Sequence, residues 1–476
     1  MMHPDSDVSP HVLVYQRIAV EEVNTPSLNT FIGGEFHLGL WSFIKKGVGL
    51  VGSFFVLRTL DLYQLGLYQL LLSGFTIASD ICHDLFASIT ANEITRAIGE
   101  GNHARAKRLF WEHALFRMMF VLIPAVAVWM LLPQVLPSYG SEFFLWARIL
   151  SLIFVLQGVL GMLNQLLSAS LQFKVLAMRP SLQKFGEVCF VGYFFFKDQL
   201  TITQLLLGQL VGMTIAVLTI LGPALRTTRA WANFTAAPRG QLYRLIKQYG
   251  GWQIIETSIR NMLGNIRPWI IRAFLNTASV GIYSVASMAT SLLKDVIPTR
   301  TLNALIPRVV GDRDRMNRIF VFGTKYYVVL SIVLICGGAV GYPIAVHILF
   351  PHLTDSITLF YLLLPTVFLF AFTKLTNIFL VAERRQRFIA AQSLVEQTVR
   401  AGAMLGLVPI MGLSGLAIAE TFAYGFVVIS KYYYLVRTGF IQRFPFSSLF
   451  RFNETDRTYA RAAVRSLPLL GKYLMK

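Results

Sequence analysis

The sequence predicts an all-α polytopic membrane protein with about twelve transmembrane helices. Hydrophobic residues make up 55% of the 476-residue chain and charged residues only 14%, whereas a soluble domain carries about 25% charged residues. The mean hydropathy is +0.58. The apolar residues also occur in blocks of about 20, the length that a helix needs to cross a hydrocarbon core. Such blocks use most of the chain, so we expect no soluble catalytic domain, no catalytic residues and no enzyme activity.

The apolar blocks follow one another with short connections, and the fifth block is the shortest. We expect a cytoplasmic N-terminal tail at residues 1–36, an N-terminal lobe at 37–235, a C-terminal lobe at 236–436 and a basic cytoplasmic tail at 437–476. The predicted spans are residues 37–57, 66–90, 114–136, 143–170, 182–196, 203–225, 249–275, 281–304, 321–346, 357–380, 391–411 and 414–436.

Lysine and arginine gather in the connections that follow the even-numbered spans. The odd-numbered connections hold little beyond Arg58 and Lys197. Because lysine and arginine stay on the cytoplasmic side, both termini are predicted to be cytoplasmic, in a cell inner membrane. The net charge of +19 then faces the anionic inner leaflet, and nucleic acid need not be invoked as a partner.

The three cysteines offer no sign of a metal site or cofactor. Cys82, Cys189 and Cys336 all fall inside apolar blocks, where cysteine behaves as a small hydrophobic residue. Their spacing matches neither a zinc site nor a disulfide framework. We therefore expect no metal and no cofactor.

The two halves of the chain resemble each other. Gly66-Leu-Tyr opens a helix that carries Asp80, and Gly281-Ile-Tyr-Ser-Val-Ala opens a helix that carries Asp295, at the same spacing. Each helix then leads into a basic connection. Six helices per half give the two repeats the same orientation, so we expect two six-helix bundles related by a pseudo-two-fold axis along the membrane normal, with a site between them.

These motifs resemble the polysaccharide-biosynthesis flippases of the multidrug/oligosaccharidyl-lipid/polysaccharide exporter superfamily, over about residues 36–440. The resemblance rests on the Arg58-x-Leu60 approach to Gly66-Leu-Tyr and on its echo at Gly281. It implies a V-shaped transporter like the multidrug (MATE) exporters, moving lipid-linked oligosaccharides outward for an exopolysaccharide or O-antigen. The resemblance also implies that the protein acts together with a polysaccharide polymerase or export machinery.

Charged residues inside the predicted spans are the candidate site residues, because such a charge costs about 2.5–3.5 kcal/mol on insertion scales. On the seventh span Glu256, Arg260 and Arg267 share one stripe at 100° per residue. On the first span Lys45 and Lys46 lie at or beside a polar face. We predict that these five residues line a cationic cleft that binds substrate.

The second and eighth spans carry matching polar stripes, and their charged members are candidates for ion coupling. These are Asp80 and Asp84 on the second span and Lys294 and Asp295 on the eighth. Structural roles also remain open: Glu256 could pair with Arg260, Glu396 could pair with Arg400, and the two lysines could reach the cytoplasmic surface. Arg117 and Arg148 lie near helix starts and are expected at the membrane–water interface. Arg267 has no acidic residue three or four positions away, which favours a functional role.

The leading hypothesis is therefore a flippase for a polyprenyl-pyrophosphate-linked oligosaccharide, because arginine and lysine bind pyrophosphate through charge-assisted hydrogen bonds. The alternative is a cation-coupled multidrug antiporter of the same superfamily, which the aspartates of the second span favour. A membrane-embedded polysaccharide polymerase or ligase is a further alternative. It would need a large outer loop, and the longest predicted one covers only residues 347–356.

Overall fold

The computed structural model describes residues 28–83, 86–135, 140–170, 172–231, 234, 237–297, 306, 313–383 and 385–442. The described elements are all helices, and each of the twelve predicted spans overlaps at least one described helix. By length and composition alone, seven of the described helices are apolar enough to cross a membrane. The all-α polytopic class predicted from hydropathy is confirmed.

The chain divides into two compact units. The first comprises Met1–Thr59 and Cys82–Gly251, and the second comprises Leu60–Ile81 and Trp252–Lys476. Packing thus groups residues 66–81 of the second predicted span with the second unit, although they precede most of the first unit in the sequence. The basic tail predicted at 437–476 lies mostly outside the described residues.

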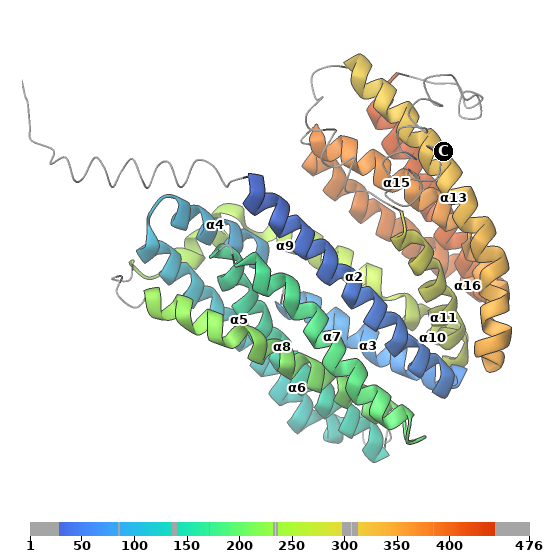
Figure 1. The fold of residues 1–476 in the computed structure, drawn as a ribbon, viewed down its shortest axis with the longest axis horizontal. Coiled ribbons are helices and arrows are strands. Elements are labelled where there is room, and N and C mark those ends of the chain that lie inside the picture. The colour runs from blue at the N-terminus through green and yellow to red at the C-terminus, as the bar shows by residue number, and fades with distance from the viewer. Residues whose placement is uncertain are drawn as a thin grey trace, which may run out of the picture. The chain divides into compact units, whose positions relative to one another are not determined.

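The first unit is a bundle of long helices that pack side by side (Figure 1). Helix α7 packs against both α2 and α8, and α6 packs against α5 and α8. Glycines allow the closest approach: a Cβ atom built on Gly212 of α8 would lie 2.7 Å from the carbonyl oxygen of Gln183 on α7. Such small-residue contacts are typical of helices that associate in lipid. The elements are α2 (Leu28–Thr59), α4 (Ala87–Gly99), α5 (His103–Val135), α6 (Gly140–Ala169), α7 (Phe173–Phe195) and α8 (Ile202–Ala230).

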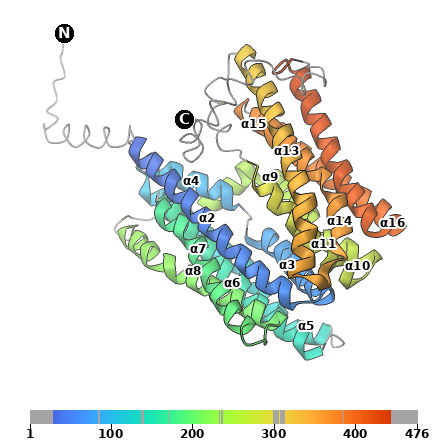
Figure 2. The ribbon, with the colours of Figure 1, turned by 45° about the vertical axis from the view of Figure 1, so that its right-hand side comes forward.

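The second unit contains the short helices α10 and α14 as well as the two longest described helices, α13 and α16. Helix α11 packs against α14 and α13, and α15 packs against α16, as can be followed in Figure 2. Helix α9 (Gln241–Asn265) runs from the first unit into the second. The remaining elements are α3 (Leu62–His83), α10 (Arg267–Phe274), α11 (Thr277–Asp295), α13 (Arg313–Leu349), α14 (Ser356–Leu363), α15 (Pro365–Ala382) and α16 (Gln386–Arg437).

Two predicted spans are interrupted at prolines. The seventh consists of α9 and α10, which meet at Ile266, two residues before Pro268. The tenth consists of α14 and α15, and Pro365 begins the second of these. Proline lacks the N–H that a continuous helix would use and its ring clashes with the preceding turn, which accounts for both interruptions. Ile266 itself keeps helical φ and ψ angles of −76° and −13°, so the stripe predicted along the seventh span stays a prediction.

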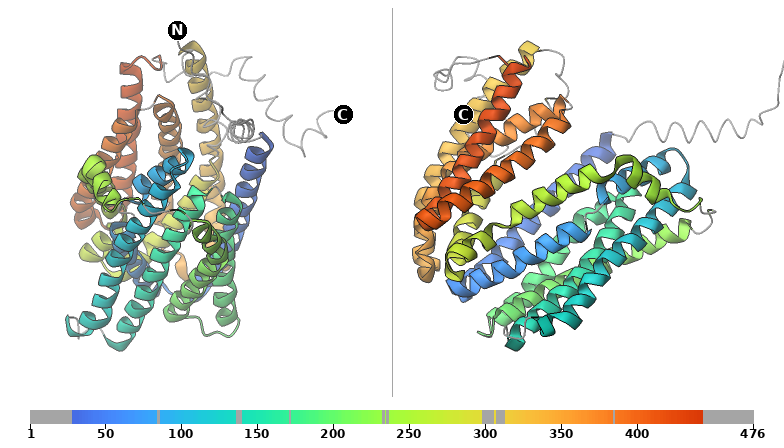
Figure 3. Two further views of the ribbon diagram at one scale, coloured as in Figure 1. Left: turned by 90° about the vertical axis from the view of Figure 1, so that its left-hand side faces the viewer. Right: turned by 180° about the vertical axis from the view of Figure 1, so that it is seen from behind.

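Helix α16 contains the last two predicted spans as a hairpin, seen from behind in the right panel of Figure 3. The chain reverses at Gly412, whose φ of 61° lies in the left-handed region that favours glycine. Close to this turn, a Cβ atom on Gly415 would lie 2.3 Å from the carbonyl oxygen of Leu407. Farther away, Gln392 donates a hydrogen bond to Ser430. The hairpin thereby brings charged residues of its two arms to the same level.

The repeat glycines of the sequence meet inside the second unit. A Cβ atom on Gly66 would lie 1.9 Å from the carbonyl oxygen of Thr277, and one on Gly281 would lie 1.9 Å from the carbonyl oxygen of Leu62. Leu62 and Thr277 are separated by the same 215 positions as Gly66 and Gly281. Helices α3 and α11 therefore cross with local two-fold symmetry, and only glycine allows their backbones to approach so closely.

Candidate functional site

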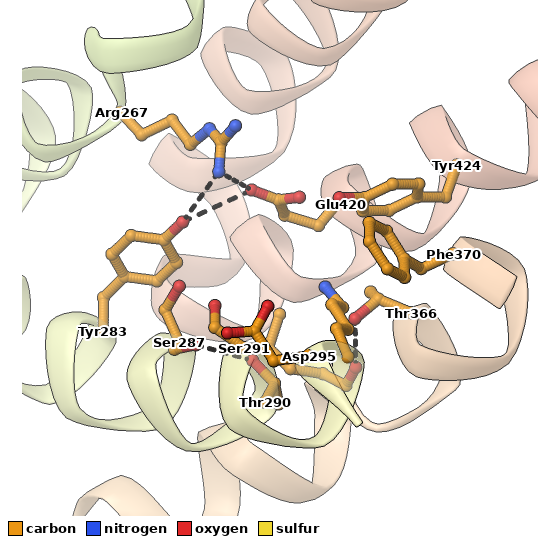
Figure 4. A pocket seen from close by; sticks show the side chains of 12 residues that line it. Arg267, Tyr283, Ser287, Thr290, Ser291, Asp295, Thr366, Phe370, Glu420 and Tyr424 are labelled. Carbon is orange, nitrogen blue, oxygen red and sulfur yellow. Dashed lines mark hydrogen bonds and ion pairs between the residues drawn. The ribbon is translucent and has the colours of Figure 1, made fainter. Parts of the chain in front are cut away.

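A cavity of about 230 Å³ lies within the second unit and is lined mainly by polar and aromatic side chains. Helices α10, α11, α14, α15 and α16 each contribute to its wall, and Figure 4 shows the side chains around it. The lining residues are Arg267, Tyr283, Ser287, Thr290, Ser291, Lys294, Asp295, Leu363, Thr366, Phe370, Glu420 and Tyr424.

The Glu420 carboxylate is the electrostatic centre of this site. Its Oε1 atom lies 3.0 Å from Nη1 of Arg267, and the Glu420 side chain is only 5% exposed. The Tyr283 hydroxyl donates to the same oxygen over 3.3 Å, and Arg267 donates to that hydroxyl over 3.3 Å. These three side chains come from α16, α10 and α11, and form a closed triangle in Figure 4. The arrangement holds Arg267 at the cavity wall.

A second arginine approaches Glu420 from the other arm of the α16 hairpin. The Nε atom of Arg400 lies 3.6 Å from Oε2 of Glu420, and its side chain is 3% exposed. Arg400 also forms the i, i+4 ion pair with Glu396 that the sequence suggested, and its guanidinium lies 4.8 Å from the centre of the Tyr424 ring. Glu420 is thus shared between two arginines.

Lys294 lies against aromatic rings rather than against a carboxylate. Its Nζ atom is 4.9 Å from the centre of the Tyr424 ring and 5.8 Å from that of Phe370, in cation–π contact. Among the described residues, no carboxylate lies within ion-pair distance of this ammonium group. Lys374 contacts the Phe370 ring as well, at 5.1 Å.

Cations outnumber carboxylates around this part of the second unit. Lys431, which is 2% exposed, lies within electrostatic range of Glu396 and Lys374. The cations of the cluster are Arg267, Lys294, Lys374, Arg400 and Lys431, and its carboxylates are Asp295, Glu396 and Glu420. The arrangement suits an anionic ligand better than a cationic one.

The two proline interruptions place polar groups at the cavity. Arg267 is the first residue of α10, directly before Pro268, and Thr366 directly follows Pro365 at the start of α15. Helix interruptions within membrane spans are tolerated where they line a cavity, and they often mark transporter binding sites. Residues beside both prolines therefore contribute to the cavity wall.

Comparison with known proteins identifies the family. The chain matches the family described as polysaccharide biosynthesis protein over residues 34–310, which is more than half of its length. The chain belongs to this family. A search of curated proteins finds no match.

Solved structures of the multidrug/oligosaccharidyl-lipid/polysaccharide superfamily share the fold of this polysaccharide biosynthesis protein. The lipid II flippase MurJ in an inward closed conformation has a TM-score of 0.66 at 11% identity, over 87% of this chain and 89% of that chain. An inward-facing multidrug MATE transporter also has a TM-score of 0.66, at 13% identity, over 85% and 95%.

A further solved structure is a superfamily transporter from Pyrococcus furiosus whose binding pocket is described as having reverse polarity. It has a TM-score of 0.56 at 12% identity, over 88% of this chain and 95% of that chain. At such identities these three likenesses show the fold alone. They establish that this family member has the transporter fold expected from its sequence.

The structure brings together three of the site residues predicted for this family member. Arg267, predicted to bind substrate, lines the cavity with Lys294 and Asp295, which were predicted for ion coupling. Asp80 lies elsewhere in the second unit, on α3, where its Oδ2 atom accepts a hydrogen bond of 3.1 Å from Asn265.

The other predicted residues are not at this cavity or are not described. Lys45 and Lys46 are exposed on α2 of the first unit, and their place in a shared cleft stays a prediction. Asp84 and the side chains of Glu256 and Arg260 lie outside the described part of the structure. Among the described residues, no group of three or more His, Cys, Asp or Glu could hold a metal ion.

Sequence reasoning missed the partners of Arg267 and the burial of Arg117. Arg267 does have an acidic partner, but it is Glu420 on a distant helix rather than a residue three or four positions away. The isolated carboxylate in the last span was the available signal. Arg117 is 6% exposed, inside the first unit, and a Cβ atom on Gly161 would lie 2.1 Å from its guanidinium; its depth in the membrane stays a prediction.

Proposed function

We propose that this protein is a flippase that carries a polyprenyl-pyrophosphate-linked oligosaccharide from the cytoplasmic to the outer leaflet by alternating access. The observation that carries the proposal is the excess of cations over carboxylates at and around the cavity, centred on Arg267, Lys294 and Arg400. Membership of the polysaccharide biosynthesis family and a fold shared with a lipid II flippase support it. The product would be an exopolysaccharide or O-antigen, made with polymerase or export partners at the cell inner membrane.

The chemistry of the ligand fits these charges. A pyrophosphate anchored to a lipid must leave water when its sugar crosses the membrane, and arginine and lysine compensate that loss with charge-assisted hydrogen bonds. The membrane potential favours the outward step, because one negative charge moved from an inside-negative cytoplasm releases about 2.3 kcal/mol per 100 mV. Transport of an anion therefore requires no coupling ion on energetic grounds.

A multidrug antiporter is the second candidate. Glu420 and Asp295 line the cavity with the aromatic rings of Phe370 and Tyr424, and carboxylates with aromatic rings suit cationic drugs. Both arginines, however, already neutralise Glu420. A cationic drug would have to displace an arginine from a buried ion pair, which disfavours this candidate.

Surface polysaccharide in cells that depend on this protein tests the proposal. The double substitution Arg260→Ala/Arg267→Ala should abolish polysaccharide while protein abundance stays normal. Lysine at both positions should restore part of it, because lysine keeps the charge but lacks the planar donor geometry of arginine. Lys197→Ala, which removes an exposed charge from the first unit, is the control. Wild-type polysaccharide in an abundant alanine double variant would overturn the proposal.

A further inference from the structure

Lys294 and Arg267 differ in how their charges are compensated. Glu420 neutralises Arg267 at 3.0 Å, whereas the Lys294 ammonium group contacts aromatic faces among the described residues and feels Glu420 only from beyond ion-pair distance. A cation held against a ring is still able to accept an anion, because the ring supplies no formal charge. Within the cavity, Lys294 is therefore the cation that can bind an anionic group without breaking an existing ion pair.

Hydroxyl groups complete the surroundings of Lys294. Ser287 and Ser291 line the cavity from the preceding turns of α11 (Figure 4). Thr290 and Thr366 donate their protons to the carbonyl oxygens of Ser287 and Leu363. Ser291 is exposed and donates to no described group, so its hydroxyl is available to a ligand.

The Glu420 carboxylate lies where a phosphate group of a ligand could also bind, beside Arg267 and Arg400. It bridges Arg267 and Arg400 through both of its oxygens and accepts from Tyr283. Two guanidinium groups and a phenol are also suitable donors for a phosphate. The Nε–H of Arg267 has no acceptor among the described residues, so this arginine can gain a hydrogen bond when it turns toward a ligand.

We propose that the cavity binds the pyrophosphate of the substrate at Lys294 and Ser291, and that Glu420 is an internal anion that the second phosphate displaces from Arg267. The identity of the ligand rests on the proposed function. Arg400 would retain Glu420 after the exchange, so no buried carboxylate is left without a cation. Arg267 would thus alternate between Glu420 in the empty site and phosphate in the occupied one.

The size of the cavity limits what it can hold. At about 230 Å³ it is smaller than the 300–1,000 Å³ typical of sites for drug-sized ligands. It accommodates a diphosphate group, but not an oligosaccharide or a polyprenyl chain. Asp295 also lines the cavity and opposes an anion, so the amide substitution Asp295→Asn should strengthen binding about threefold.

Binding of farnesyl pyrophosphate to the purified full-length protein in lipid nanodiscs, measured by titration calorimetry, tests the inference. Lys294→Gln should weaken binding at least tenfold, and Glu420→Gln should tighten it several-fold because the competing carboxylate is gone. Glu420→Asp, whose shorter carboxylate retreats from Arg267, should tighten binding in the same direction and serves if the glutamine variant does not fold. Lys197→Gln is the matched control and should bind as the wild type does. Farnesol should bind none of these proteins at this site.

Two results would overturn the inference. One is wild-type affinity in Lys294→Gln, and the other is weakened or unchanged affinity in a folded Glu420→Gln or Glu420→Asp protein. The proposed function fails separately: normal polysaccharide in the Arg260→Ala/Arg267→Ala cells, with pyrophosphate binding that depends on Lys294, would reject the flippase and keep the anion site. Loss of polysaccharide in the Arg260→Ala/Arg267→Ala cells, with pyrophosphate binding that does not depend on Lys294, would reject the anion site and keep the flippase.

Discussion

At the scale of single residues, Glu420 organises the charges of the second unit. Its two oxygens neutralise Arg267 and Arg400, and all three side chains are largely removed from solvent. Removing one partner of a buried ion pair destabilises a protein far more than replacing both partners by apolar residues. The stability of this cluster therefore depends on the balance of its charges more than on any single contact.

This balance predicts an asymmetry between the partners. Glu420→Gln leaves two arginines without their shared carboxylate and should lower stability by about 3 kcal/mol, near the usual cost of breaking a buried pair. Arg267→Gln should cost less, because Arg400 still neutralises Glu420. The double variant Glu420→Gln/Arg267→Gln should be more stable than Glu420→Gln alone, because the stability effects of substitutions within one network are not additive. Thermal unfolding in detergent measures all three, and additive losses would contradict a shared network.

The sequence identified Arg267, Lys294 and Asp295 because charges are rare and costly within a membrane span. It did not identify the contacts between Arg267, Tyr283 and Glu420. These residues lie on three helices, and helical periodicity relates residues of one helix only. The absence of an acidic residue near Arg267 in the sequence suggested an unpaired arginine, and tertiary packing supplied the partner instead.

At the scale of elements, hydropathy located the spans but not their interruptions. The length of an apolar block fixes where a helix crosses, so each predicted span overlaps a described helix. The interruptions depend on Pro268 and Pro365, which an average over 20 residues cannot register. Helix α9 also begins at Gln241, before the predicted start at residue 249, because a polar turn can be helical outside the apolar block.

The crossing of α3 and α11 yields a prediction at this scale. Gly66→Ala and Gly281→Ala each place a methyl group 1.9 Å from a backbone oxygen, a distance that forces the helices apart. Each should lower thermal stability, and the double variant should lose less than the two losses together because both disrupt one contact. Gly425→Ala, where a Cβ atom would meet nothing within 4 Å, is the control. Stability equal to wild type in both single variants would contradict the crossing.

At the scale of the whole molecule, the internal repeat and the distribution of basic residues both constrain how the protein is oriented in the membrane. Gly66 and Gly281 open equivalent helices at equal distances from Asp80 and Asp295, and their contact preserves this equivalence. Repeats of six helices require that equivalent helices enter the membrane from the same side. The orientation of one half therefore fixes that of the other.

The distribution of lysine and arginine predicts which side that is. Basic residues cluster after the even-numbered spans, so these connections and both termini should be cytoplasmic. In a background without Cys82, Cys189 and Cys336, single cysteines at Asp198 and Thr354 should react in intact cells with a thiol reagent that cannot cross membranes. A cysteine at Asn102 should react only after the cells are permeabilised. Asp198, Thr354 and Asn102 are all exposed, so reactivity reports the side of the membrane rather than burial. Labelling of Asn102 in intact cells would reverse the predicted orientation, and with it the outward direction of transport.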